Sequence, residues 1–210
     1  IASAKPTLEE RGDIIHFGID EVYPNVEFDV IKFIELYKKA KEYAFKNDKN
    51  LIIVGGTGFY LKALIDGLSQ GIETKIKLDI PQEDAYDLLY KIDKEYMEKI
   101  EKNDRYRIEK AYAIYKQTSL GPTQYFQKNP KIAVAKDLKI FEILWDKEEL
   151  KNRILKRTKI MINSGIIDEV IFLEKKYTRE PNSMSSIGII ETLEYLDGKL
   201  TKQELEEKIS

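Results

Sequence analysis

The feature that most constrains the fold of this chain is the segment Leu51–Leu64, LIIVGGTGFYLKAL, in which a glycine-rich turn joins an apolar run to an amphipathic stretch. The four apolar residues Leu51–Val54 are typical of a strand that is covered on both faces, as in a parallel sheet. The residues after the turn have helical spacing. A glycine-rich turn between a strand and a helix leaves room for a ligand to approach the first amides of the helix.

This turn does not match the two common nucleotide-binding fingerprints. A P-loop ends in Gly-Lys-Ser/Thr, but Thr57 is followed by Gly58 and no lysine. A dinucleotide-binding turn needs a third small residue where this chain has Leu61. Two interpretations remain open from the residues alone. Gly55, Gly56 and Gly58 either supply unusual backbone angles only, or they let a ligand approach the Thr57 hydroxyl.

Hydrophobic periodicity predicts the other elements. We expect strands at Ile14–Ile19 and Ile132–Leu144. We expect helices at Phe28–Phe45, Ala85–Ile100, Asp104–Lys116, Lys147–Asn163, Ile166–Tyr177 and Ser186–Leu196. Gly165 and Gly198 occupy positions where the C-terminal caps of helices belong. Together these elements predict an α/β chain with a sheet core and a mainly helical second half.

Composition excludes several kinds of site. The 210 residues include no cysteine and one histidine, so a disulfide framework, a thiolate zinc site and a histidine metal cage are excluded. No window approaches the roughly 18 apolar residues of a membrane span. The net charge is −2, so a polyanion must meet a local basic patch. These features predict a cytoplasmic enzyme or binding protein without membrane contact.

The glycine turn is one of a set of sequence blocks that occur together. The blocks are IASAKP, HFGID, FDVIKF, VGGTGFYLKALIDGLS, KNDRYRIEKAYAIYKQT, RILKRTKIMINSGIIDEVIFL and SIGIIETLEYLDGKL. In this order and over nearly the whole chain, they resemble the tRNA dimethylallyltransferases, also called tRNA isopentenyltransferases, of the bacterial type. Each block alone is a modest signal, and their shared order makes the resemblance strong.

The resemblance implies a fold and an activity. The fold would be a P-loop NTPase-like parallel sheet core, at residues 1–68 and 104–210, with a helical C-terminal part and a helical tRNA-clasping insertion at 69–103. The activity would be transfer of a dimethylallyl group from dimethylallyl diphosphate to N6 of adenosine 37, beside the tRNA anticodon. Such a reaction requires the base to leave its stack. The implied partners are the tRNA anticodon stem-loop, dimethylallyl diphosphate and Mg²⁺, and we expect a monomer.

The resemblance also implies roles for individual residues. Thr57 matches the family threonine that contacts the flipped adenine, so we expect it to be catalytic. Arg157 matches an arginine that the family points at the diphosphate, and Arg153 shares its helical face. Lys5 is expected near phosphate or RNA, and His16 is expected to be structural.

The expected tRNA-binding residues form one helical stretch and one outlying lysine. They are Tyr106, Arg107, Ile108, Glu109, Lys110 and Lys77. Lys110 replaces an arginine of the family pattern, which keeps the charge but loses the planar fork. Without the resemblance, a solvated charged face would be the preferred interpretation of this stretch.

Some family segments are not in this sequence. The P-loop and an Asp-Ser pair are expected before Ile1, and a Lys-Arg-Gln-x-x-Trp region after Ser210. We therefore expect the 210-residue chain by itself to be inactive. Two other functions remain open: a P-loop-type small-molecule kinase, and a non-catalytic RNA-binding domain.

Overall fold

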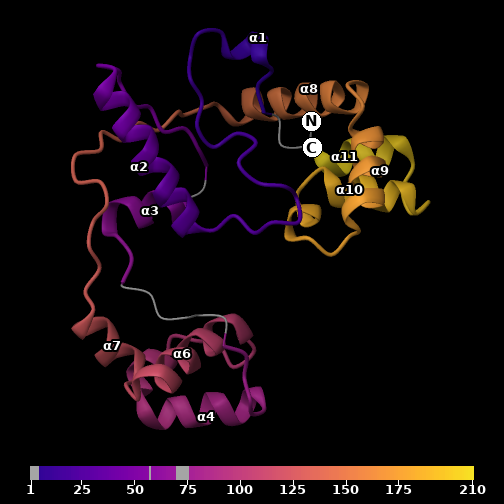
Figure 1. Ribbon diagram of the computed structural model, residues 1–210. Coiled ribbons are helices and arrows are strands. Elements are labelled where there is room, and N and C mark those ends of the chain that lie inside the picture. The colour runs from indigo at the N-terminus through magenta and orange to yellow at the C-terminus, as the bar shows by residue number, and fades with distance from the viewer. Residues whose placement is uncertain (1–4, 57, 70–75) are drawn as a thin grey trace. The chain divides into compact units, whose positions relative to one another are not determined.

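The computed structural model describes residues 5–56, 58–69 and 76–210, which pack as two units (Figure 1). The first unit lies within residues 1–53 and 140–210, and the second within 54–139. The first unit contains α1 (Leu8–Arg11), α2 (Val30–Lys46), α8 (Lys147–Asn163), α9 (Ile166–Tyr177), the 3₁₀ helix η1 (Asn182–Ser185), α10 (Ile189–Leu196) and α11 (Lys202–Ile209). The second contains α3 (Gly58–Asp66), α4 (Gln82–Ile92), α5 (Lys94–Met97), α6 (Arg105–Thr118) and α7 (Pro122–Lys128).

The parallel sheet core predicted from the sequence is wrong, because the described residues form no β-strand. Their only β contact is an isolated antiparallel bridge between Leu68 and Ile132. The segments Ile14–Ile19, Leu51–Val54 and Ile132–Leu144, predicted as strands, form neither a ladder nor a helix. Because these segments are not strands, the predicted P-loop NTPase-like sheet core is wrong as well.

The physical reason is that a strand is not a local structure. Its N–H and C=O groups need a neighbouring strand as partner. The composition of an apolar run suits burial in a sheet. The strands that pair with it must come from other segments, and the described part of the chain supplies none. The side chains of the runs are accordingly exposed, with Ile52 at 80%, Val54 at 90% and Phe141 at 85%.

The helical predictions are mostly confirmed. The predicted bounds of α8 and α9 agree with the structure residue for residue, and α2 and α6 agree to within two residues. Gly165 and Gly198 both follow helix C-termini and adopt the left-handed backbone, with φ values of 96° and 74°. Only glycine takes this conformation without strain.

One predicted helix, Ala85–Ile100, is wrong as a single element. Asp93 divides it into α4 and α5, because its backbone is not helical, with φ −146° and ψ 74°. Its carboxylate accepts hydrogen bonds from the amides of Tyr96, at 3.1 Å, and Thr123, at 2.6 Å. The prediction for Ser186–Leu196 was too long, since α10 begins at Ile189. The helix α11 was not predicted, although Thr201 and Glu204 form a capping box, which indicates the start of a helix.

The core of the second unit lies between α4, α5 and α6. It consists of Ala85, Tyr86, Leu89, Met97, Ile100, Ile108, Ala111 and Tyr112. At its edge the Tyr112 hydroxyl and the Lys116 ammonium both donate to Asp79. These hydrogen bonds lower the pKa of Asp79 below its ordinary value. They attach the segment before α4 to α6.

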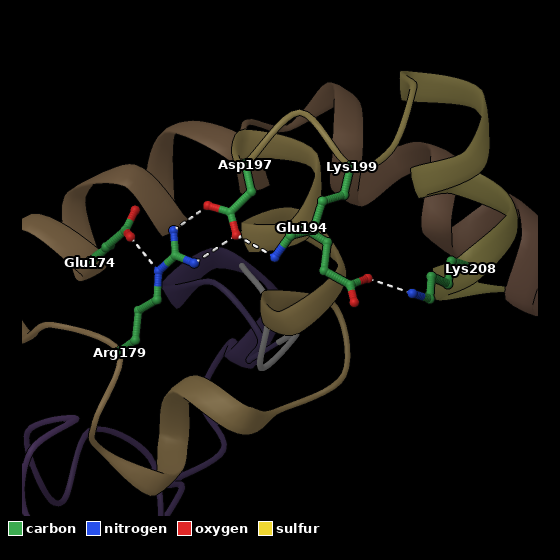
Figure 2. A network of polar contacts seen from close by, with 6 residues as sticks. All are labelled: Glu174, Arg179, Glu194, Asp197, Lys199 and Lys208. Atoms are coloured by element: carbon green, nitrogen blue, oxygen red, sulfur yellow. Dashed lines mark hydrogen bonds and ion pairs between the residues drawn. The ribbon is translucent and has the colours of Figure 1, made fainter.

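The core of the first unit lies among α8, α9, α10 and α11. Figure 2 shows a network of ion pairs in the same unit. Arg179 donates two hydrogen bonds to the Asp197 carboxylate, at 2.9 and 2.7 Å, and a third to Glu174. Lys199 donates to Asp197 at 3.0 Å. The two cations hold the pKa of Asp197 well below its ordinary value, and Arg179 contributes most.

The low pKa of Asp197 predicts an acid dependence of stability. Because folding lowers this pKa, the carboxylate stabilises the fold above its ordinary pKa of about 3.9, and this contribution is lost as the pH falls through the folded value. Asp197→Asn should therefore be less stable than wild type at pH 7 but lose less stability on acidification. Urea unfolding at pH 7, 4 and 3 measures this, and the exposed Asp13→Asn is the control. If Asp197→Asn loses as much free energy of unfolding on acidification as wild type does, the ion pairs of the network do not lower the pKa of Asp197.

Candidate functional site

The glycine turn opens on free space among the described residues. A Cβ built at Gly55, Gly56 or Gly58 meets no atom within 4 Å. None of the three has the left-handed φ that favours glycine. Within the described residues, neither a left-handed backbone nor close packing requires glycine at these positions. The approach of a ligand to this turn therefore stays a prediction. Thr57 lies outside the described residues.

The N-terminal half of α6 presents aromatic and basic side chains to solvent. Tyr106 is 68% exposed, and Lys110 Nζ lies 5.2 Å from the centre of its ring. Arg107 Nη1 pairs with Asp104 at 3.1 Å, and the same carboxylate caps the helix by accepting from the Arg107 amide at 3.0 Å. An exposed pair of this kind contributes little stability, so a phosphate can compete for the guanidinium.

The other predicted residues of this stretch are placed differently. Ile108 is fully buried in the core of the second unit. Glu109 is half-buried and accepts from Arg105 Nε at 2.8 Å. Lys77 is exposed and precedes α4. Of the predicted residues on α6, Tyr106 and Arg107 are therefore exposed and Lys110 is half-buried.

The helix α8 carries the two arginines that were predicted to bind diphosphate, and both are exposed. The Asp146 side chain caps this helix by accepting from the Glu148 and Glu149 amides. The guanidinium carbon of Arg153 lies 4.2 Å from the centre of the ring of Trp145, which precedes the helix, and the two form a cation–π contact. Arg157 stands one turn further along α8. Between them the two side chains offer a cationic face, as recognition of a diphosphate requires.

A hollow of about 640 Å³ lies in the first unit, against α9, η1 and α10. Its lining includes Lys5, Asp20 and Glu169. Lys5 pairs with Asp20, and its hydrogen bond lowers the pKa of that carboxyl. The pair is exposed and contributes little stability, so the expected contact of Lys5 with phosphate or RNA stays a prediction. His16 is exposed, and its Nδ1 donates to the Ile14 carbonyl at 2.8 Å; the structural role expected for it stays a prediction.

A smaller hollow of about 240 Å³ lies in the second unit beside α3. Its lining residues are Phe59, Lys62, Ala63, Gly67, Leu68 and Lys131. Sequence reasoning missed it because Lys131 is distant along the chain and joins the others only through the fold. The local signal was the spacing of Phe59 and Lys62, which share one face of a helix.

Two kinds of site are absent from the described part of the chain. No group of three or more His, Asp or Glu residues there could hold a metal ion. The described residues thus form no protein cage for Mg²⁺. Among them there is also no helix of the length and apolar character that a membrane span needs.

Comparison with known proteins defines the class to which the chain belongs. The profile of the IPP transferase family matches residues 1–210, which is the whole chain. The chain therefore belongs to the IPP transferase family.

Individual relatives make the comparison more specific. The chain is 79% identical over 210 residues to the tRNA dimethylallyltransferase of Aliarcobacter butzleri (strain RM4018), a match that covers 100% of this chain and 72% of the relative. It is 50% identical over 218 residues to the tRNA dimethylallyltransferase of Sulfurimonas denitrificans (strain ATCC 33889 / DSM 1251), covering 100% and 73%. A solved eukaryotic dimethylallyltransferase acting on tRNA is similar with a TM-score of 0.80 at 26% identity, covering 98% of this chain and 55% of that chain.

Proposed function

We propose that this protein is a tRNA dimethylallyltransferase, which moves a dimethylallyl group from dimethylallyl diphosphate to N6 of adenosine 37 in tRNA. The observation that carries the proposal is the 79% identity to a tRNA dimethylallyltransferase along the whole chain. In this reaction the N6 nitrogen forms a bond to the allylic carbon while the bond from that carbon to the diphosphate oxygen breaks, and N6 releases one of its two protons. The leaving diphosphate needs cationic groups to stabilise its developing charge.

The RNA side of the reaction is supported by the exposed face of α6. Arg107 and Lys110 can neutralise phosphates, and Tyr106 offers an aromatic surface to a base. We assign tRNA contact to this face and to Lys77. We also propose that residues 69–103 form the insertion that clasps the anticodon stem-loop, with 1–68 and 104–210 around it.

The donor side is supported by the exposed arginines of α8. We assign the diphosphate to Arg157, with Arg153 one turn before it on the same helix. The family resemblance suggests that Mg²⁺ accompanies the diphosphate. The proposed setting is a monomer in the cytoplasm.

The proposal is tested by product analysis. The full gene product is incubated with dimethylallyl diphosphate, Mg²⁺ and an anticodon stem-loop carrying adenosine at position 37, and the nucleosides are then resolved by mass spectrometry. One dimethylallyl group on that adenosine is the expected result. A stem-loop with inosine at position 37 is the matched control, because it lacks the exocyclic amine. Binding of the stem-loop without transfer, or phosphate transfer to a small metabolite instead, would refute the proposal.

Thr57→Ala should slow transfer more than it weakens tRNA binding. The residue is proposed to place its hydroxyl against the extruded adenine, so its loss affects the reacting geometry and leaves the phosphate contacts intact. We expect a loss of about tenfold or more in the single-turnover rate, the scale of one lost hydrogen bond to a reacting group. Thr57→Ser keeps the hydroxyl and should restore most of the rate. Equal single-turnover rates for wild type and Thr57→Ala would remove the threonine from the mechanism.

A further inference from the structure

The small hollow beside α3 combines two cations with an exposed aromatic ring. Lys62 and Lys131 are both exposed, and neither makes an ion pair within the described residues. Phe59 is 62% exposed at the rim. Phe59 and Lys62 lie one turn apart on the same face of α3, and the chain segment after α7 brings Lys131 to them.

The position of Lys131 is fixed by tight backbone contacts. The amides of Val134 and Ala135 both donate to the Leu64 carbonyl, at 3.0 and 2.9 Å. Leu68 and Ile132 form the antiparallel bridge. Gly67 packs so closely against Ile132 that a Cβ there would lie 1.8 Å from the Ile132 oxygen. The hollow is therefore a preformed feature of the second unit, which reduces the entropy cost of binding a ligand.

The charges of the hollow indicate what kind of ligand it would hold. Two ammonium groups on the lining of one hollow favour an anionic ligand over a neutral or cationic one. The lining offers no carboxylate to neutralise them. A phosphate is a suitable anion for two lysines, each of which binds it as a point charge.

The exposed ring of Phe59 makes the ligand more specific. A free phosphate would use the two lysines and leave the ring in water. A nucleotide uses both, because its base stacks on an aromatic face while its phosphate meets the cations. An unpaired nucleotide fits better than a paired one, since both faces of a base inside a duplex are covered by its neighbours.

We propose that this hollow binds a second unpaired nucleotide of the tRNA loop, distinct from the modified adenosine. The base stacks on Phe59, and its phosphate lies between Lys62 and Lys131. This inference rests on the proposed function, because it takes tRNA as the substrate. The hollow would then hold the loop in register while another base is extruded, at the energetic cost that base flipping carries.

The test measures binding of the anticodon stem-loop to the full gene product. Lys62→Gln with Lys131→Gln should weaken binding about tenfold at about 0.1 M salt and reduce the slope of log K against log salt by about one to two. The control is Lys38→Gln with Lys39→Gln, which removes the same charge from the exposed side of α2 and should leave both quantities unchanged. Circular dichroism and thermal unfolding confirm that the variants fold.

A second measurement isolates the stacking contact. Phe59→Leu keeps an apolar side chain but removes the π face, and it should weaken stem-loop binding by about tenfold. With 2-aminopurine placed at each unpaired loop position in turn, one position other than 37 should be quenched by wild type and not by Phe59→Leu. The same fluorescence position should respond to the double lysine variant.

The outcomes separate this inference from the proposed function. If wild type modifies adenosine 37 while the double lysine variant binds the stem-loop with wild-type affinity and salt slope, the inference fails and the function stands. If the variants weaken binding of AMP but not of the stem-loop, the assignment to RNA is overturned. If wild type transfers no dimethylallyl group, the function fails, and the binding measurements still report on the hollow.

Discussion

Gly67→Ala should separate α3 from the segment that follows α7. Gly67 has φ 80°, where a side chain costs about 1–2 kcal/mol, and its Cβ would lie 1.8 Å from the Ile132 oxygen and 2.2 Å from the Ile132 carbonyl carbon. Overpacking against backbone adds about 1–3 kcal/mol. We expect a total loss of roughly 2–5 kcal/mol in the free energy of unfolding. Urea unfolding measures the loss, and hydrogen exchange should show faster exchange of the Val134 and Ala135 amides.

Gly198→Ala is the matched control for this prediction. Gly198 has a similar φ of 74°, but a Cβ there meets no atom within 4 Å. It should therefore show only the backbone cost of about 1–2 kcal/mol, and it should leave the Val134 and Ala135 amides protected. If Gly67→Ala costs no more than Gly198→Ala, the close contact between Gly67 and Ile132 does not exist in solution.

The same variant links the fold to the proposed RNA site. The close contact between Gly67 and Ile132 brings Lys131 near Phe59 and Lys62. Gly67→Ala should therefore also weaken stem-loop binding. The weakening should be no larger than that of the double lysine variant, since both changes remove the same phosphate contact.

Helix predictions succeeded where the deciding signals are close in sequence. The bounds of α8 follow from Asp146, which caps its first amides, and from Gly165, which takes the left-handed backbone just past its end. The predicted helix Ala85–Ile100 is wrong at Asp93 because the deciding contact is distant in the sequence. The Asp93 side chain accepts from Thr123, thirty residues away, and no pattern within the predicted helix Ala85–Ile100 reveals that partner.

The sheet and the site were limited in the same way. The run Leu51–Val54 has the composition of a buried strand, but a ladder depends on segments elsewhere. On α6, helical spacing accounts for both the exposure of Tyr106 and the burial of Ile108, whose partners Ala111 and Tyr112 follow at three and four residues. The resemblance to a family placed Ile108 among the RNA-binding residues, whereas its helical spacing puts it on one face with Ala111 and Tyr112.

Asp93→Ala should be among the most destabilising single changes in the second unit. The buried carboxylate accepts from the Tyr96 amide at 3.1 Å and from the Thr123 amide and hydroxyl at 2.6 and 2.9 Å. It thereby caps α5 and ties down the first turn of α7. Gly121 leaves space for it, because a Cβ at Gly121 would lie 2.9 Å from the Asp93 Cβ. Removing the carboxylate leaves three donors without their acceptor.

The expected cost is about 3 kcal/mol, because hydrogen bonds to a charged group contribute about 1.5–3 kcal/mol and buried donors lose their partners together. Asp93→Asn keeps one acceptor oxygen and should lose about half as much. Asp146→Ala removes an exposed N-cap that accepts from two amides, and it should cost only about 1 kcal/mol. Urea unfolding ranks the three variants.

Since α6 packs on α7, stem-loop binding through Tyr106, Arg107 and Lys110 should weaken in Asp93→Ala and stay intact in Asp146→Ala. Equal stability losses for the two alanine variants would show that Asp93 acts as an ordinary cap and does not join α5 to α7.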